Sequence, residues 1–352
     1  MPIRKMRGMT IESAIRTNEK LEFLRLPSSY ADEPEQVEVI ETHFAWVFLS
    51  RLYAYKLNKP IAFHDVDYST VAKRKHAANR ALRLNRRLAQ SVYIDVVPLV
   101  AHGSGLRLEF DGEPVDWLLK MRRLPADLML ESRLLSSGLS KADLNAIVVK
   151  LVAFYRQTAL APWDGSQYMT ALRRSILRFG DDLSALPGEI DVAAADKLVA
   201  AQIGFIERNV ASLEGRAEQA HIVDAHGDLR PEHICLDDET NIIDCIEFSD
   251  ELRLLDTAEE MSFLALECTR LGRSDIGAEL IKLYEAESGD FVSDNLRDFY
   301  SSRQALNRAV LSAWHLEDPF FAATQTQWIE RTHWYLQAGQ SSIESALNLA
   351  KK

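Results

Sequence analysis

The sequence predicts an α+β fold made of a strand-rich N-terminal part and a mainly helical C-terminal part. Segments rich in β-branched and aromatic residues are concentrated between residues 37 and 121, whereas helical periodicity dominates from residue 140 onward. A short acidic hairpin within residues 226–247 interrupts the helical series. Because strands and helices are segregated along a chain of 352 residues, we expect a small sheet lobe and a large helical lobe.

Six strands are expected in the N-terminal part. Their shared signal is a short run of β-branched and aromatic residues bounded by turn-forming residues, as at Ser50-Arg51 and Asp111-Gly112. The strands are expected at residues 37–40, 44–49, 52–57, 91–99, 106–110 and 115–121. One helix is expected among them, starting at Ser69 as its cap and ending near Ala89.

Helices account for most of the remaining chain. The segment Ser140-Lys141-Ala142-Asp143 resembles a capping box and predicts a helix that ends near Tyr155. Further helices are expected at residues 190–213, 256–271, 276–287, 293–316 and 325–350. We therefore expect three regions, which are an N-terminal extension at 1–30, a small lobe at 31–123 and a large lobe at 124–352.

The composition argues against several classes of function. Hydrophobic residues make up 47% and charged residues 26%, as in ordinary globular proteins. The net charge of −11 argues against nucleic-acid binding, and no apolar run approaches the length of a membrane span. The basic N-terminus lacks the apolar core of a secretory signal, so a cytoplasmic location is expected. Cys235, Cys245 and Cys268 lack metal-site spacing and are expected to be reduced core thiols.

The most informative segment begins at His226 and reads HGDLRPEHICLDDETNIIDCIE. It contains Asp228 and, sixteen residues later, Asp244. Two short strands joined by a turn at residues 237–240 would bring both carboxylates to one edge of a hairpin. Such a pair suits phosphoryl transfer, because one carboxylate can deprotonate an acceptor hydroxyl while the other holds Mg²⁺ against nucleotide phosphates.

These residues resemble the motifs of the aminoglycoside phosphotransferases and choline kinases. His226-Gly227-Asp228 is similar to their catalytic-loop HGD, and Ile243-Asp244-Cys245-Ile246-Glu247 to their metal-binding IDxE. The resemblance implies a bilobal protein-kinase-like fold with a small antiparallel sheet. It also implies ATP-dependent phosphorylation of an alcohol group on a small molecule. Segments such as ETHFAWVFLSRLYAYKL and DCIEFSDELRLLD resemble a bacterial branch in which a P-loop ATPase domain often follows, which suggests a separate P-loop ATPase partner.

The resemblance assigns roles around the two aspartates. Asp228 is expected to be the catalytic base, with Arg230 neutralising phosphate charge beside it. Asp244 is expected to hold the metal, with Glu247 supporting it or lying at the surface. His233 stands where the family has asparagine, and an imidazole ligand at this position would favour Mn²⁺ over Mg²⁺.

The resemblance also assigns nucleotide-binding residues. Lys56 matches the strand lysine that holds the nucleotide phosphates, but Ala81 stands where its glutamate partner is expected. Thr42 and His43 lie where kinases place a loop over the phosphates. At the expected lobe junction, Lys120 and Met121 are further candidates for contact with the nucleotide.

Two other functions remain open alternatives. The changes at Ala81 and His233 are compatible with a nucleotide-binding regulatory module that has lost transferase activity. A metallohydrolase using His226, Asp228 and His233 is disfavoured, because the further histidine-rich segments of a two-metal site are missing. The family resemblance further implies that Asp256 braces the catalytic loop. It also implies that a late helix walls the acceptor pocket, but three residues there could equally form an ordinary polar surface, namely Tyr300, Arg303 and Arg308.

Overall fold

The computed structural model describes residues 11–63, 66–103, 105–136, 138–186, 190–317 and 319–349. The chain divides into two compact units. The strand unit comprises residues 1–132 and 232–251, and the helical unit comprises residues 133–231 and 252–352. This division differs from the expected lobes at two points. The first boundary falls at Ser132, and the segment that carries Asp244 groups with the strands.

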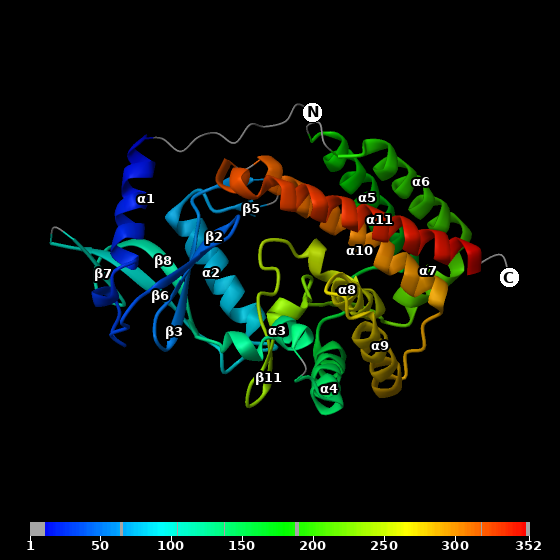
Figure 1. Ribbon diagram of the computed structural model, residues 1–352, viewed down its shortest axis with the longest axis horizontal. Coiled ribbons are helices and arrows are strands. Elements are labelled where there is room, and N and C mark those ends of the chain that lie inside the picture. Colours follow the sequence, from blue (N-terminus) through cyan, green and yellow to red (C-terminus); the bar gives the residue numbers. More distant parts are fainter. Residues whose placement is uncertain are drawn as a thin grey trace. The chain divides into compact units, whose positions relative to one another are not determined.

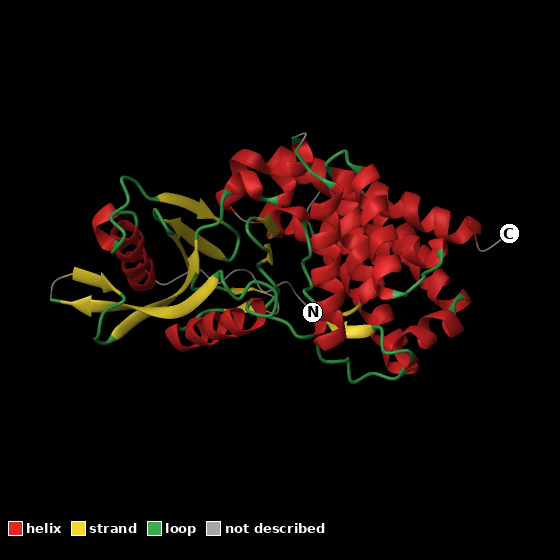
Figure 2. Ribbon diagram, turned by 90° about the horizontal axis from the view of Figure 1, so that it is seen from below, coloured by secondary structure: helices red, strands yellow, loops and turns green. Residues whose placement is uncertain are grey.

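Within the described residues, the strand unit contains a six-stranded antiparallel sheet in the order β1-β2-β3-β8-β6-β7. Figure 2 shows its strands in yellow. The strands are β1 (Glu38–Glu41), β2 (Ala45–Leu49), β3 (Tyr53–Asn58), β6 (Tyr93–His102), β7 (Gly105–Leu108) and β8 (Pro114–Arg122). Two smaller antiparallel pairs are β4 (Ala62–Phe63) with β5 (Val66–Asp67) and β10 (Ile234–Leu236) with β11 (Thr240–Ile242). The six strands predicted from sequence are therefore confirmed within a few residues.

A helix covers each face of this sheet (Figure 1). Residues of α1 (Ile11–Leu24) pack with Tyr55 and Leu118, whereas α2 (Val71–Asn85) packs with Leu119. Side chains of neighbouring strand residues point to opposite faces, so α1 and α2 lie on opposite sides. Thr70 rather than the predicted Ser69 caps α2, because its hydroxyl accepts the Lys73 amide.

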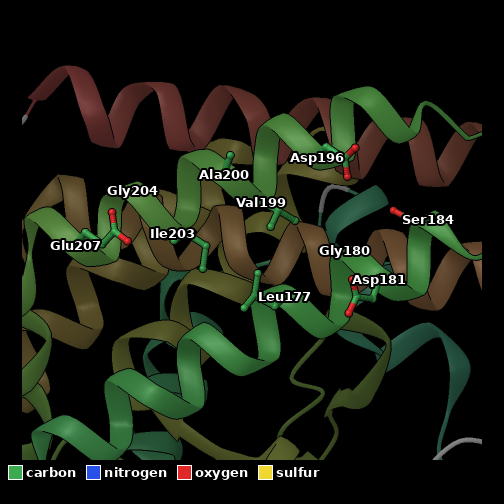
Figure 3. A pocket seen from close by; sticks show the side chains of 10 residues that line it. All are labelled: Leu177, Gly180, Asp181, Ser184, Asp196, Val199, Ala200, Ile203, Gly204 and Glu207. Atoms are coloured by element: carbon green, nitrogen blue, oxygen red, sulfur yellow. The ribbon is translucent and has the colours of Figure 1, made fainter. Parts of the chain in front are cut away.

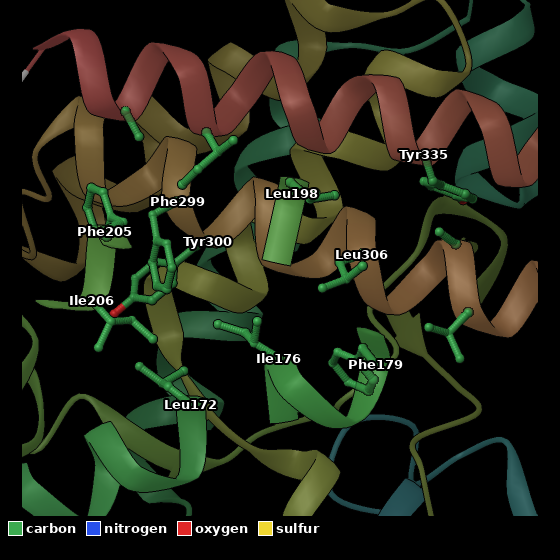
Figure 4. Packing of buried hydrophobic residues seen from close by; sticks show 14 of the residues in the cluster. Leu172, Ile176, Phe179, Leu198, Phe205, Ile206, Phe299, Tyr300, Leu306 and Tyr335 are labelled. Carbon is green, nitrogen blue, oxygen red and sulfur yellow. The ribbon is translucent and has the colours of Figure 1, made fainter. Parts of the chain in front are cut away.

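The helical unit packs around α10 (Asp294–Trp314) and α11 (Gln325–Leu349) (Figure 1). Figure 4 shows the core between these and the preceding helices, where the rings of Phe205 and Phe299 stack with centroids 4.5 Å apart. The other helices are α3 (Leu130–Leu135), which begins in the strand unit, α4 (Lys141–Gln157), α5 (Gly165–Ser184), α6 (Val192–Arg208), α7 (Val210–Glu218), α8 (Thr257–Arg270) and α9 (Ser274–Ser288). None of the described helices is both long enough and apolar enough to cross a membrane.

Of the sequence-based expectations about the helices and the cysteines, two are confirmed and two differ from the structure. The predicted capping box of α4 is confirmed, since Ser140 and Asp143 exchange side chain–backbone hydrogen bonds. The single helix expected over residues 190–213 is wrong, because Asn209 ends α6 and a second helix follows. Helix α5 was not predicted. The three cysteines are free and buried, which confirms that they are core thiols.

Candidate active site

A two-stranded sheet in the helical unit positions the segment that carries Asp228. Strand β9 (Ile222–Asp224) pairs antiparallel with β12 (Leu254–Asp256), and the Ala225 amide then donates to the Arg253 carbonyl at 2.9 Å. Gly227 has a φ of 88°, a conformation that side-chain-bearing residues rarely adopt. Buried His226 accepts the Asp228 amide through Nδ1 at 3.3 Å. This histidine therefore supports the loop from within.

Glu260, on α8, holds the same loop and was not recognised from sequence. Its Oε1 accepts the backbone amides of His226 and Gly227 at 2.9 and 2.7 Å, and its Oε2 accepts the Tyr155 hydroxyl at 2.8 Å. Burial and the Glu260 charge raise the pKa of Tyr155 well above its ordinary value, so this phenol stays a donor. Glu259 and Glu260 lie in the first turn of α8, where acidic residues are common, so the sequence offered no specific signal for this role.

Two arginines contact the Asp228 carboxylate. Arg230 Nη2 lies 3.0 Å from Oδ2, and Arg308 Nη1, from α10, lies 3.5 Å from Oδ1. Arg308 is 8% exposed, and Arg303 is buried against Glu259 with its Nε 2.6 Å from Oε1. The interpretation of these two residues as surface arginines is therefore wrong.

Asp256 is a bracing residue. It is fully buried, and its carboxylate accepts the Ala258 amide at the start of α8 at 2.8 Å. Arg216 donates to both its oxygens at 2.7 Å, and the Tyr300 hydroxyl donates at 2.7 Å. These bonds fix β12 to α8 and α10. Asp256 thus supports the strand that pairs with β9, immediately before the segment that carries Asp228.

The segment that carries Asp244 is anchored within the strand unit. The β10–β11 hairpin is present as predicted, with Cys235 paired to Asn241. Asp244 has a φ of 61°, and its amide donates to the Tyr93 hydroxyl at 3.0 Å. The next amide, of Cys245, donates to Asn85 Oδ1 at 2.8 Å. A positive φ is uncommon outside glycine, and here the two hydrogen bonds hold the backbone in it. They thereby fix the direction in which the Asp244 side chain leaves the backbone.

Lys56, on β3, pairs with Asp244. Its Nζ lies 2.7 Å from Asp244 Oδ1, and the two side chains are 20% and 46% exposed. On the other side of the carboxylate, His233 Nε2 lies 3.8 Å from Oδ2. Ala81 is buried in the core beside Leu119, so its position on α2 offers no carboxylate to the lysine. The strand unit therefore brings together three predicted residues.

Glu247 lies next to Tyr68 in the same unit. The Tyr68 hydroxyl donates to Glu247 Oε1 at 2.6 Å, and Glu247 is 7% exposed. Burial and the Glu247 charge raise the pKa of Tyr68 above its ordinary value. Glu247 is thus a buried carboxylate bound by Tyr68, so its interpretation as a surface residue is wrong, and its support of the metal stays a prediction.

The predicted phosphate loop forms a tight local turn. Thr42 Oγ1 bonds both the amide and the carbonyl of Ala45 at 3.0 Å, and its own amide donates to that carbonyl at 2.8 Å. The ring of His43 packs edge-on against Phe44, with centroids 4.6 Å apart. Contact between the Thr42 hydroxyl and a phosphate would therefore require this turn to open, and the assignment of both residues stays a prediction.

Lys120 and Met121 lie on opposite faces of β8. Lys120 is opposite Tyr55 in the register and donates to both Glu109 oxygens at 2.8 Å. Met121 packs with the cluster on the α2 face, the face to which Lys56 also belongs. A nucleotide contact by Lys120 on the Lys56 face would therefore have to come from its backbone.

The metal-binding potential of the strand unit rests on Asp244 and His233. No group of three or more His, Cys, Asp or Glu side chains among the described residues is arranged to hold a metal ion. A carboxylate with one nearby imidazole fits an ion that keeps most of its ligands as water or phosphate oxygens, as Mg²⁺ does. The residues therefore fit a nucleotide-bound divalent ion.

A groove of about 440 Å³ lies elsewhere, between α5 and α6 (Figure 3). Apolar side chains such as Leu177 and Ile203 line it together with Asp181, Asp196 and Glu207. None of its lining residues is a predicted site residue. The groove therefore takes no part in the candidate site.

Sequence comparison identifies long relatives. No family model matches the chain. Uncharacterised proteins of Mycobacterium bovis and Mycobacterium tuberculosis are 32% identical over 284 residues, which is 79% of this chain and 55% of each relative. The chain thus spans about half the length of the curated relatives it matches.

Structural comparison identifies kinases. Choline kinase LicA from Streptococcus pneumoniae matches with a TM-score of 0.52 and 15% identity, covering 92% of this chain and 99% of LicA. LicA has also been crystallised with AMP. A choline/ethanolamine kinase family protein from Mesorhizobium loti matches with a TM-score of 0.51 and 14% identity, covering 94% and 99% of the two chains. A Ralstonia eutropha protein assigned to the aminoglycoside phosphotransferases matches at 0.50 and 13%, covering 94% and 98%. The predicted fold class is therefore confirmed, and the chain has the kinase-like fold of choline kinases and aminoglycoside phosphotransferases.

Proposed function

We propose that this protein is an ATP-dependent phosphotransferase that acts on a hydroxyl group of a small molecule, as the kinases of the same fold do. The observation that carries the proposal is the 2.7 Å contact between Lys56 and Asp244. Within a kinase-like fold, a strand lysine and a metal-segment aspartate in contact form the polar pair that nucleotide phosphates and a divalent ion require. Asp228 then supplies the remaining catalytic group.

The acceptor side of the reaction rests on Asp228. Its carboxylate accepts the proton of the acceptor hydroxyl while the hydroxyl oxygen forms a bond to the γ-phosphorus. The bond between that phosphorus and the β–γ bridging oxygen breaks, and ADP leaves with the bonding electrons. Arg230 neutralises charge on the transferred group. Glu260 keeps the loop in position by binding the amides of His226 and Gly227.

The donor side rests on Lys56 and Asp244. Lys56 binds phosphate oxygens of ATP, and Asp244, with His233 beside it, holds Mg²⁺ or Mn²⁺. The bound ion neutralises the charge of the phosphates. The small acceptor molecule is the expected partner, and a separate P-loop ATPase stays a prediction from the family resemblance.

A second candidate is a nucleotide-binding regulatory module without transferase activity. The buried position of Ala81 favours it, because that site on α2 offers no carboxylate to orient Lys56 for transfer. In this case ATP binding persists and ADP formation does not occur.

Nucleotide titration and turnover of three variants test the proposal. Asp228→Asn should abolish ADP formation and leave ATP affinity nearly unchanged, because the base acts in the transition state. Asp244→Asn should weaken metal-dependent ATP binding. Asp238→Asn, in the β10–β11 turn, serves as the matched control. Absence of ATP binding rejects both candidates, and binding without turnover in the wild type supports the regulatory module.

A further inference from the structure

The candidate base lies between two arginines within the helical unit. Arg230 and Arg308 approach different oxygens of the Asp228 carboxylate, at 3.0 and 3.5 Å. A third guanidinium, of Arg270, is held by Glu267 at 2.9 Å. Counted with Glu260, which binds the loop amides of His226 and Gly227, three guanidinium groups stand against three carboxylates. The cluster is thus balanced in charge, in a chain whose net charge is −11.

Arg308 still has capacity to bind another group. Its contact with Asp228 is longer than the 2.7–2.9 Å typical of a charge-assisted hydrogen bond. Its Nε has no hydrogen-bond partner among the described residues. The guanidinium lies 5.9 Å from the centroid of the Tyr335 ring, and the Tyr335 hydroxyl donates to Glu267. A buried guanidinium with donors to spare favours an additional anionic partner.

Arg308 stays positively charged. Burial opposes the positive charge, but Tyr335, Asp228 and Glu267 together raise the pKa of this arginine above its ordinary value. One turn farther along α10, the buried Ser312 hydroxyl also lacks a hydrogen-bond partner within the part of the chain that the structure describes. Residues four apart share a helix face. Arg308 and Ser312 therefore add donors to one side of α10.

We infer that the acceptor of this phosphotransferase carries an anionic group, a carboxylate or a phosphate, close to the hydroxyl that is phosphorylated. The inference rests on the proposed function. The acceptor anion binds Arg308 and takes the place of Asp228 as its partner. Asp228 then accepts the hydroxyl proton while Arg230 faces the transferred phosphoryl group. A neutral or cationic acceptor has no anionic group that could replace Asp228 as the partner of Arg308.

Matched probes with vicinal hydroxyls test the inference by calorimetry. The protein is saturated with Mg²⁺ and a non-hydrolysable ATP analogue, and then titrated with glycerate, glycerol 3-phosphate, glycerol and 3-aminopropane-1,2-diol. At least one anion should bind about tenfold or more tightly than the neutral and cationic probes. Comparison of glycerate with glycerol 3-phosphate distinguishes a carboxylate from a phosphate.

Variants connect the selectivity to Arg308. Arg308→Gln should remove the preference for the anion, whereas Arg308→Lys should retain part of it, with thermal unfolding confirming that both variants fold. Arg208→Gln, at an exposed position on α6, is the matched control. Equal affinity for all probes, preference for the amine, undetectable binding of both anions, or unchanged selectivity in Arg308→Gln would each overturn the inference.

The same titrations distinguish failure of the proposed function from failure of the inference about the acceptor. If the ATP analogue does not bind, the proposed function is rejected, and the same probes are titrated into the nucleotide-free protein. Anion selectivity that depends on Arg308 then still supports the anion site. If the analogue binds and the anions show no advantage, the inference about the acceptor fails while the phosphotransferase proposal stands.

Discussion

Lys56 Nζ and Asp244 Oδ1 lie 2.7 Å apart although 188 residues separate them in sequence. The proposed function assigns both groups to ATP, the lysine to its phosphates and the carboxylate to its metal. In this contact the ammonium of Lys56 and the carboxylate of Asp244 neutralise each other. In the proposed complex, the phosphates and the metal ion would neutralise them instead. Under the proposed function, binding of metal and nucleotide would replace this contact with new ones.

Lys56→Met should lower ATP affinity with little change in stability. Partly exposed ion pairs contribute about 0–1 kcal/mol to folding, so the free energy of unfolding should change by no more than that. Loss of the phosphate contact should weaken ATP binding about tenfold or more. Calorimetry and thermal unfolding measure the two effects, with Lys73→Met on the exposed part of α2 as control. Unchanged affinity would contradict the assignment of Lys56.

Glu260→Gln should lower the turnover number more than it changes ATP affinity. The amide cannot reproduce a carboxylate that accepts two backbone amides and a phenol, so one buried donor loses its partner at a cost of about 1–3 kcal/mol. The loop that carries Asp228 then becomes less well positioned. Tyr155→Phe removes only the phenol bond and should have a smaller effect on turnover. Equal effects of both variants would argue against loop positioning.

Arg216→Met should strongly destabilise the folded protein. It leaves Asp256 and Asp290 without their buried cation, and breaking a buried ion pair costs about 3–5 kcal/mol. Denaturant unfolding measures the loss. Arg173→Met breaks an exposed pair with Glu207 and should change stability by less than about 1 kcal/mol. A similar small effect for Arg216→Met would contradict the bracing role of Asp256.

Stability should fall as the pH decreases through the ordinary range of histidine because of His221. Burial, followed by the charge of Arg216, lowers its pKa from 6.5, while Asp290 and Asp256 oppose the shift. The unfolded chain then binds the proton more tightly than the folded chain, so this contribution is complete above pH 6.5 and is lost below it. His221→Asn should flatten the difference in unfolding temperature between about pH 7.5 and about pH 5. An identical pH dependence in both proteins would exclude this role.

His233→Asn should shift the metal preference from Mn²⁺ toward Mg²⁺. The imidazole Nε2 lies 3.8 Å from Asp244 Oδ2, and nitrogen ligands favour the later, softer ion. The ratio of ADP formation with the two ions measures the preference in wild type and variant. Indistinguishable ratios would show that His233 only packs beneath Asp244.

The sequence predicts elements whose signal is local. The strands, the Ser140 cap and the β10–β11 hairpin each depend on a few neighbouring residues, and all three are found. Helix α5 was missed although both local signals are present, since Asp164 and Gln167 form a capping box and Leu172, Ile176, Phe179 and Leu183 recur at helical spacing. The roles of Glu260 and Arg308 depend on packing between distant segments. No local pattern in one sequence distinguishes them from other charged helical residues.

The placement of residues 232–251 has a consequence for dissection of the protein. This segment completes the strand unit, whereas the chain on both sides of it belongs to the helical unit. Ile243 packs in the cluster with Leu119, and the Asp244 amide binds Tyr93. A fragment that ends at Ser132 would therefore lack part of its own interior, and no single cut of the polypeptide yields two complete halves. Reconstitution would need a fusion of residues 1–132 to 232–251, with the two ends that remain in the helical unit rejoined by a linker.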